Sequence, residues 1–202
     1  FYGSDTRPVD PADLVAVFLR GGEPAASAAE ALVSLGELGA GAIVAQLPGP
    51  LNFDRNAMRG PIPPLAEHGP LLGLLVRMGS LTAPALLRRL NDSALDVRYY
   101  ATLAAGEIAA PELVRGLGQR LFDPDGGVRQ VAALALSRFP RSPELDTLYE
   151  SLRGELPGPD ALRQRFAAEA AGALVDVLAL PRLIELCKHF DSTVASSAQR
   201  AL

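Results

Sequence analysis

Residues 92–106 read Asp-Ser-Ala-Leu-Asp-Val-Arg-Tyr-Tyr-Ala-Thr-Leu-Ala-Ala-Gly, and residues 123–137 repeat the pattern as Asp-Pro-Asp-Gly-Gly-Val-Arg-Gln-Val-Ala-Ala-Leu-Ala-Leu-Ser. The first aspartate, the valine-arginine pair and the following alanine of the two copies stand 31 positions apart. A fixed period of this size is typical of repeat proteins, in which each unit covers the apolar face of its neighbour. The sequence therefore predicts an all-α solenoid built from helical hairpins.

Each copy contains the apolar stripe of an amphipathic helix. Counted from Val97 and from Val128, apolar residues recur after 3, 4, 7, 8 and 11 positions, which is the spacing of one helical face. These residues are Tyr100, Ala101, Ala104, Ala105 and Ile108 in the first copy, and Val131, Ala132, Ala135, Leu136 and Phe139 in the second. Because many of them are alanines, we expect neighbouring helices to approach one another closely.

The order aspartate, valine-arginine, then alanine, leucine, alanine and a small residue resembles the HEAT repeat family. The period of 31 resembles the short bacterial form named after bilin lyases more than the long form of about 40–47 residues. The resemblance implies a right-handed solenoid, here of about five to six hairpins. It also implies a ladder of hydrogen bonds between repeats, formed by Asp92, Arg98, Asp123 and Arg129.

Further hairpins are predicted on both sides of the two copies. Pro84, Pro111, Pro143 and Pro181 each stand where a first helix begins, a position that tolerates proline. Gly36, Gly79 and Gly106 are each followed by a similar stretch, which predicts three copies of one turn between helices. After Asp160 another second helix follows, with Arg163 in the place of the valine, so its ladder partner is in doubt.

The domain organisation is expected to be simple. We interpret residues 1–12 as a linker or tail and residues 13–202 as one repeat domain, whose first helix, 14–20, begins after a capping Asp13. Five prolines in residues 48–64 exclude a continuous helix there. This loop either covers the apolar helix at 71–76 or leaves a groove open for a partner helix.

Composition limits the classes of function. Apolar residues make up 49% of the 202 residues, aromatic residues 5%, and the net charge is −4. The acidic balance and the absence of tryptophan disfavour nucleic-acid binding. Lys188 is the only lysine among 19 basic residues and Cys187 is the only cysteine, which favours a bacterial, cytoplasmic protein. The apolar run 71–76 is too short to cross a membrane, so no membrane insertion is expected.

The ends of the chain suggest a larger context. A start at Phe1 indicates a piece of a longer protein, and the last repeat, Asp191–Leu202, lacks a polar cap. We therefore expect further repeats, or a second chain that covers this end through self-association.

A binding surface is predicted on the second helices, on the side away from the buried stripe. Its residues are Tyr99, Thr102, Leu103, Arg129, Gln130, Leu134, Arg165 and Glu169. Second helices line the concave face of stacked hairpins, and tyrosine and arginine are common in interface hot spots. For the leucines, packing between repeats is an equally good interpretation.

No set of residues points to catalysis, a cofactor or a metal. We expect His68 to lie on the surface, and Cys187 and His189, two positions apart on a helix, cannot share a metal ion. The prediction is a non-enzymatic scaffold or adaptor that binds a protein partner of unknown identity. The alternatives are a nucleic-acid-binding module and a bilin-lyase-like enzyme or chaperone.

Overall fold

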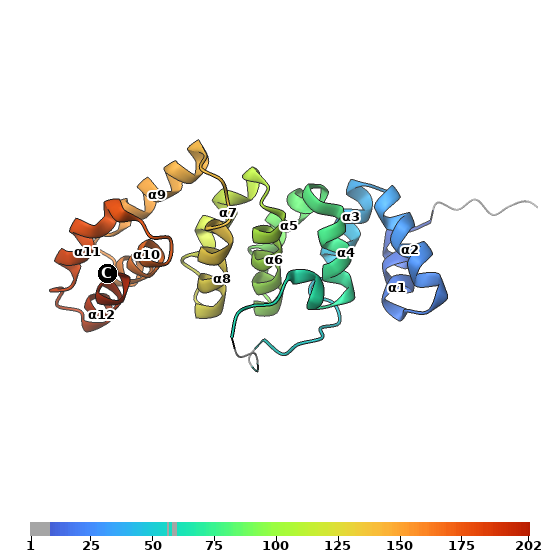
Figure 1. The fold of residues 1–202 in the computed structure, drawn as a ribbon, viewed down its shortest axis with the longest axis horizontal. Helices are drawn as coiled ribbons and strands as arrows, with labels where there is room; N and C mark the ends of the chain where they lie inside the picture. The colour runs from blue at the N-terminus through green and yellow to red at the C-terminus, as the bar shows by residue number, and fades with distance from the viewer. Residues whose placement is uncertain (1–8, 56, 58–59) are drawn as a thin grey trace, which may run out of the picture. The chain divides into compact units, whose positions relative to one another are not determined.

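The computed structural model describes residues 9–55, 57 and 60–202 of the chain. Its contacts divide the chain into two compact units, Phe1–Ala85 and Leu86–Leu202, and each unit is described by itself. All regular secondary structure in the described residues is helical (Figure 1). The predicted all-α repeat fold is confirmed, whereas the right-handed sense and the number of hairpins stay predictions.

The first unit consists of short helices, each started by a proline, a glycine or an aspartate. They are α1 (Pro11–Arg20), α2 (Glu23–Ser34), α3 (Glu37–Ala45), η1 (Leu65–Glu67), α4 (Pro70–Met78) and η2 (Gly79–Thr82). The cap of α1 is Asp10, whose carboxylate accepts the Ala12 N–H, so the prediction of Asp13 as the cap is wrong. Residues 1–8 of the predicted linker lie outside the described residues, and residues 11 and 12 are already helical.

The proline-rich segment is tied to the start of α4. The backbone N–H of Asn52 donates to the carbonyl of His68 at 2.7 Å, and its side chain donates to the carbonyl of Glu67 at 2.9 Å. His68 is fully buried, with Nε2 3.1 Å from the Pro63 carbonyl oxygen and its ring edge-on to Phe53. The expectation of a surface histidine is therefore wrong. These contacts favour the covering loop over the open groove.

The helical run from Pro70 to Arg89 joins α4, η2 and α5 (Ala83–Arg89) and is 20 residues long. By length and composition alone this run meets the criterion for a membrane span. The expectation of no membrane insertion was based only on the shorter run 71–76. Half of its apolar window is buried inside the protein, and core helices of soluble proteins also meet this criterion. Gly79, at φ 58°, interrupts the run at the end of α4.

The second unit is a succession of hairpins (Figure 1). After α5 its helices are α6 (Leu95–Ile108), η3 (Pro111–Leu113), α7 (Val114–Arg120), α8 (Gly126–Leu136), α9 (Pro143–Glu155), α10 (Ala161–Ala173), η4 (Val177–Ala179), α11 (Leu180–Leu186) and α12 (Ser192–Ala201). The second helices pack on one another, α6 on α8 and α10 on α12, while α7 and α9 pack side by side. Pro84, Pro111, Pro143 and Pro181 all lie in first turns, as predicted.

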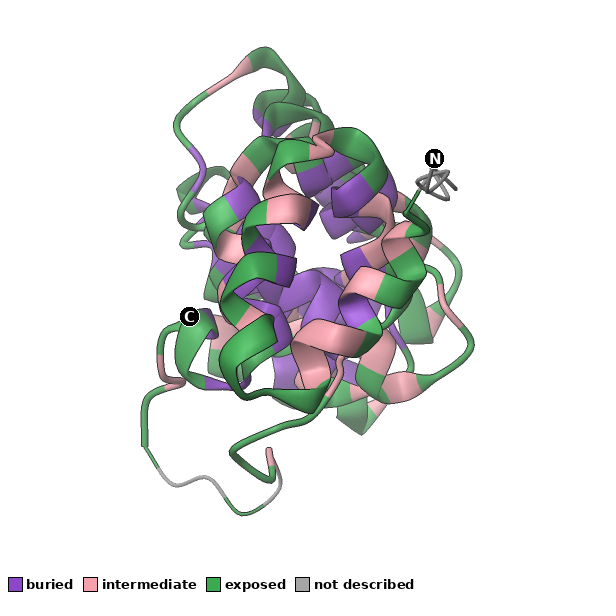
Figure 2. Ribbon diagram, turned by 90° about the vertical axis from the view of Figure 1, so that its right-hand side faces the viewer, coloured by how far each residue is buried: buried purple, intermediate pink, exposed green. Residues whose placement is uncertain are grey.

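The predicted apolar stripes form the core of this unit. Tyr100, Ala101 and Ala104 on α6 are fully buried, and the corresponding stripe on α8 is buried throughout. Figure 2 shows buried residues along the sides of the helices that face their neighbours. On α10 the buried stripe is continued by Phe166, Ala167, Ala170 and Ala171.

Gly106 does not form the third copy of the predicted turn. Gly36 and Gly79 follow their helices with positive φ values of 57° and 58° and ψ values of −125° and −136°. Gly106 instead lies inside α6, and Ala109 ends that helix in a different conformation, at φ 52° and ψ 34°. A Cβ atom at Gly106 would stand 2.5 Å from the Cβ of Ala135 on α8. This glycine is therefore required for helix packing and not for the turn.

Candidate functional site

The part of the predicted surface that lies on α6 is buried. Tyr99 is 5% exposed and Thr102 not at all, so the prediction that these residues are accessible is wrong. Leu103 is 3% exposed, which agrees with the alternative of packing between repeats. The ring of Tyr99 packs edge-on against Tyr100, with ring centroids 5.2 Å apart. The hydroxyl of Thr102 donates to the carbonyl of Arg98 at 2.7 Å, which satisfies this polar group within its own helix and permits burial.

The Asp123 carboxylate connects two successive repeats. Nε and Nη2 of Arg98, from the preceding repeat, donate to it at 2.9 and 3.2 Å. Arg120 donates at 2.8 Å, and the backbone N–H of Asp125 donates at 3.0 Å. The carboxylate is fully buried and receives four donors, so its charge is compensated inside the protein. The structure thus brings Arg98 and Asp123 together, as the resemblance implied.

Asp92 occupies the equivalent position one repeat earlier. Its carboxylate accepts the backbone N–H of Ala94 at 2.9 Å and a hydrogen bond from Arg89 at 2.7 Å. These hydrogen bonds, that from Ala94 above all, hold the pKa of Asp92 below its ordinary value. Asp92 and Asp123 are therefore acceptors in the turn before a second helix.

Arg129 is the equivalent of Arg98, but its partner is different. The residue in the next repeat that corresponds to Asp123 is Gly158, which has no carboxylate. Nε of Arg129 donates instead to Glu169 on α10 at 3.1 Å, and its guanidinium lies 4.0 Å from the centre of the Phe166 ring. Nη1 of Arg129 also donates to the backbone carbonyls of Asp123 and Pro124, which fixes the side chain in place.

The last repeat replaces the turn aspartate by His189. Its Nδ1 accepts the backbone N–H of Asp191 at 3.1 Å, as the aspartates do in the earlier turns. Asp191 then caps α12 by accepting the N–H of Thr193. His189 therefore has a structural role that its sequence neighbourhood did not reveal.

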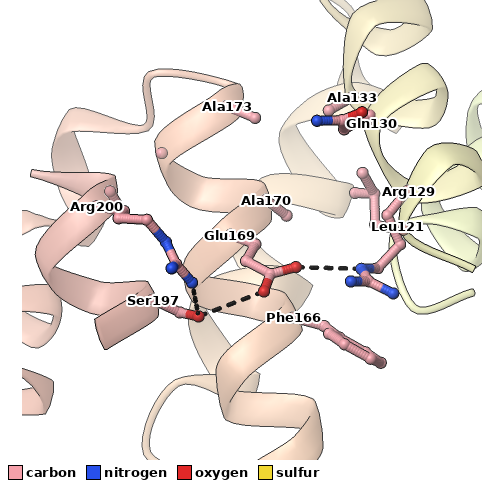
Figure 3. Close-up of a pocket in the computed structure, with 13 residues that line it drawn as sticks. Leu121, Arg129, Gln130, Ala133, Phe166, Glu169, Ala170, Ala173, Ser197 and Arg200 are labelled. Atoms are coloured by element: carbon pink, nitrogen blue, oxygen red, sulfur yellow. Dashed lines mark hydrogen bonds and ion pairs between the residues drawn. The ribbon is translucent and has the colours of Figure 1, made fainter. Parts of the chain in front are cut away.

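An open groove of about 540 Å³ lies beside these residues, on the second helices of the unit (Figure 3). It is lined from α8, α10 and α12, with Leu121 at one side. The polar and aromatic lining residues are Arg129, Gln130, Phe166, Glu169, Ser197 and Arg200. Small residues form the rest of the wall, among them Ala133, Ala170 and Ala173.

The groove contains part of the predicted surface and adds residues to it. Arg129, Gln130 and Glu169 line it, Arg165 lies beside it on α10, and Leu134 is exposed but outside the lining. Ser197 and Arg200 were not predicted, because the predicted surface was not extended to the last repeat. Phe166 was predicted only as a core residue. It lines the groove although it is only 7% exposed.

Glu169 lies between cations from two helices. Its two carboxylate oxygens accept from Nε of Arg129 and Nε of Arg165, each at 3.1 Å, and Ser197 donates to it at 3.3 Å. Partial burial raises the pKa of Glu169, but the hydrogen bonds and charges of Arg165 and Arg129 outweigh this effect and lower the pKa overall.

Arg200 adds a third guanidinium, which donates to the hydroxyl of Ser197 at 3.0 Å (Figure 3). Within the described part of the chain, no carboxylate forms an ion pair with it. Three arginines thus surround one glutamate, and the groove carries an excess of positive charge in a protein whose net charge is −4.

No group of three or more histidine, cysteine, aspartate or glutamate side chains in the described residues could hold a metal ion. Cys187 is half-buried, and its thiol donates to the carbonyl of Leu183 at 3.2 Å. Elsewhere in the unit, Val177, Leu178, Ile184 and Phe190 of the last hairpin expose large apolar side chains. Self-association through this region stays a prediction.

Solved structures with similarity to the chain include helical-repeat proteins. The complex of CpcE and CpcF of phycocyanin lyase from Nostoc sp. PCC7120 is 19% identical, with 95% of this chain and 96% of that chain covered and a TM-score of 0.44. A designed armadillo repeat protein in complex with the peptide (KR)4 is 18% identical, with 96% and 98% covered and a TM-score of 0.40. Among curated proteins, none matches the chain significantly.

The family model of HEAT repeats matches residues 83–164, from the start of α5 into α10. These residues contain both copies of the 31-residue pattern and the Arg98–Asp123 contact between them. The hairpins of this segment are therefore similar to HEAT repeats.

Proposed function

We propose that the second unit is a non-enzymatic interaction module that binds an extended segment of a protein partner in the groove formed by α8, α10 and α12. The observation that carries this proposal is the groove itself, which combines open space, polar groups and the Phe166 ring on consecutive second helices. Pockets that mix apolar walls with a few polar groups are typical binding sites. A bacterial, cytoplasmic location is part of the proposal and rests on composition alone.

The contacts around the groove support binding by a pre-formed surface. Arg129 is held by two backbone carbonyls, by Glu169 and by the Phe166 ring, so little side-chain freedom is left to lose on binding. Gln130 and Ala173 are exposed at the rim, where they are accessible to a partner. Alanines at the wall leave room for one apolar side chain of the partner.

The test uses random peptides displayed on phage and selected on the immobilised full chain. Ala173→Trp places a large ring in the groove at an exposed position, so it fills the site without disturbing the core. We expect the affinity of selected peptides to fall about tenfold or more, which corresponds to about 1.4 kcal/mol. The measurement is fluorescence anisotropy, with circular dichroism as the check on folding.

The matched control is Ala26→Trp, an exposed alanine on α2 in the first unit. Peptides should bind this variant as they bind the unchanged protein. If every selected peptide binds Ala173→Trp and Ala26→Trp equally well, the partner does not use the groove and the proposal fails.

A further inference from the structure

The charge of the groove indicates the chemistry of its partner, and the inference rests on the function proposed above. We infer that the groove accepts an acidic peptide segment, in which carboxylates flank an apolar residue, and that Glu169 occupies part of this site as an internal competitor. The apolar residue would lie against Ala133 and Ala170, and the carboxylates would reach the arginines at the two ends of the groove.

The first step of the argument is the imbalance of charge. Arg129 and Arg165 share the single carboxylate of Glu169, and Arg200 contacts a neutral hydroxyl. A second carboxylate, supplied by a partner, would therefore meet a local excess of positive charge. Opposite charges across an interface favour both binding and specificity.

The second step is the geometry of the donors. Nε and Nη1 of Arg129 are occupied by protein acceptors, which orients the guanidinium against the Phe166 ring. Arg200 is exposed on the last turn of α12, and one of its nitrogens donates to Ser197. A guanidinium has five N–H donors, so both arginines retain donors for an incoming carboxylate.

The third step concerns Glu169, which is 28% exposed at its side chain. Its carboxylate neutralises two arginines when the groove is empty, and it repels any carboxylate that enters. Removing its charge leaves Arg129 in place, because the carbonyls of Asp123 and Pro124 still hold it. Glu169 therefore lowers the affinity of the groove for acidic segments.

A peptide fits this site better than nucleic acid does. A nucleic acid carries closely spaced phosphates and is bound by extended basic surfaces. Here the three arginines are grouped around one acid. Phe166 is only 7% exposed, and the Arg129 guanidinium lies over its ring, so the ring offers no open face for a base to stack on.

The experiment measures the binding of three labelled synthetic peptides to the full chain by fluorescence anisotropy. In the first peptide glutamates flank two leucines, in the second glutamines replace the glutamates, and in the third lysines replace them. We expect the acidic peptide to bind most tightly and to lose affinity as salt increases, because exposed charges are screened. Single-stranded oligothymidylate serves as a polyanion probe.

Two groove variants should change the affinity for the acidic peptide in opposite directions. Arg200→Gln should weaken it about threefold to tenfold, because one charge-assisted contact is lost, and Glu169→Gln should strengthen it about threefold. The controls are Arg182→Gln and Glu185→Gln, which change the same charges in the ion pair on α11, outside the groove. Each control changes the net charge by one unit, which should shift the binding of all charged probes slightly. We expect no further change in the affinity for the acidic peptide.

Each alternative result has a defined meaning. The glutamine peptide could bind as tightly as the acidic peptide, and both could lose the same affinity in Ala173→Trp. That result would support the groove as the binding site and overturn the inference that the partner is acidic. Weaker binding of the acidic peptide to Glu169→Gln would overturn the competitor role. Tighter, Arg200-dependent binding of oligothymidylate would assign the site to nucleic acid. Absence of binding by the acidic peptide would also overturn the inference.

Discussion

Two contacts between second helices differ in how closely the helices pack. One joins α6 to α8, and the other joins α8 to α10. α6 and α8 pack along much of their length, with Gly106 against Ala135 and the buried Arg98–Asp123 ion pair beside them. α8 and α10 meet over a shorter stretch and are joined by the more exposed Arg129–Glu169 pair. The first contact is closed, and the second borders the groove.

The spacing of the repeats explains this difference. Val97 and Val128 are 31 positions apart, as are Arg163 and Val194 on α10 and α12, but Val128 and Arg163 are 35 positions apart. The close contacts place a glycine against an alanine in both 31-residue steps, the second being Gly172 against Ala201. In the longer step the position of the glycine is held by Ser137, and the two helices do not come as close. An irregular step in a repeat array can thus leave a groove open between helices.

The largest expected effect is on the buried ion pair of the closed contact. Asp123→Asn leaves Arg98 and Arg120 without their carboxylate and should lower the free energy of unfolding by about 3–5 kcal/mol. Glu169→Gln, in the open contact, should cost no more than about 1 kcal/mol, because its side chain is partly exposed. Urea unfolding followed by circular dichroism measures both. Similar losses in the two variants would show that the contacts are energetically alike.

A smaller effect is expected from filling the closed contact. Gly106→Ala places a Cβ atom 2.5 Å from the Cβ of Ala135, so the helices must separate, at a cost of about 1–3 kcal/mol. Ser137→Ala removes only a hydroxyl that bonds to its own helix at an exposed position, and should change stability by no more than about 0.5 kcal/mol. Thermal unfolding compares the pair. An unchanged melting temperature in Gly106→Ala would contradict the close approach of α6 and α8.

The smallest effect concerns acid pH. The pKa values of Asp92 and Glu169 are lowered in the folded protein from ordinary values of 3.8 and 4.5. The unfolded chain therefore binds more protons in this range, so the stabilisation is complete above the ordinary values and is lost as the pH falls through the lowered ones. We expect the melting temperature to fall below about pH 4.5, and to fall less steeply in Glu169→Gln. If the melting temperature of Glu169→Gln fell with pH as steeply as that of the unchanged protein, Glu169 would not contribute to the acid sensitivity.

Residue periodicity alone predicted much of the second unit. The 3, 4, 7, 8, 11 spacing identified buried residues such as Ala101 and Ala132, and prolines such as Pro143 marked where first helices begin. These features depend on helix geometry, which is local and repeats every few residues. Local pattern was sufficient because each hairpin contacts mainly its neighbours.

The candidate site could be predicted only in part. Gln130 and Glu169 were identified because each lies on the side of its helix opposite the buried stripe, but the same rule placed Tyr99 and Leu103 on a surface where they are buried. Arg200 was missed although it lies 31 positions after Glu169, at the equivalent position of the repeat, because the predicted surface was not extended to the last repeat. Which face of a helix is accessible depends on its neighbours and not on its own sequence.

The sequence by itself determined that this protein folds into helical hairpins with alanine-rich buried faces, because periodicity and turn residues act over a few positions. Tertiary structure alone decided where the repeats separate, which carboxylate compensates each arginine, and that three guanidinium groups gather around Glu169. These outcomes depend on distances between helices that are far apart along the chain, and local sequence patterns do not fix those distances.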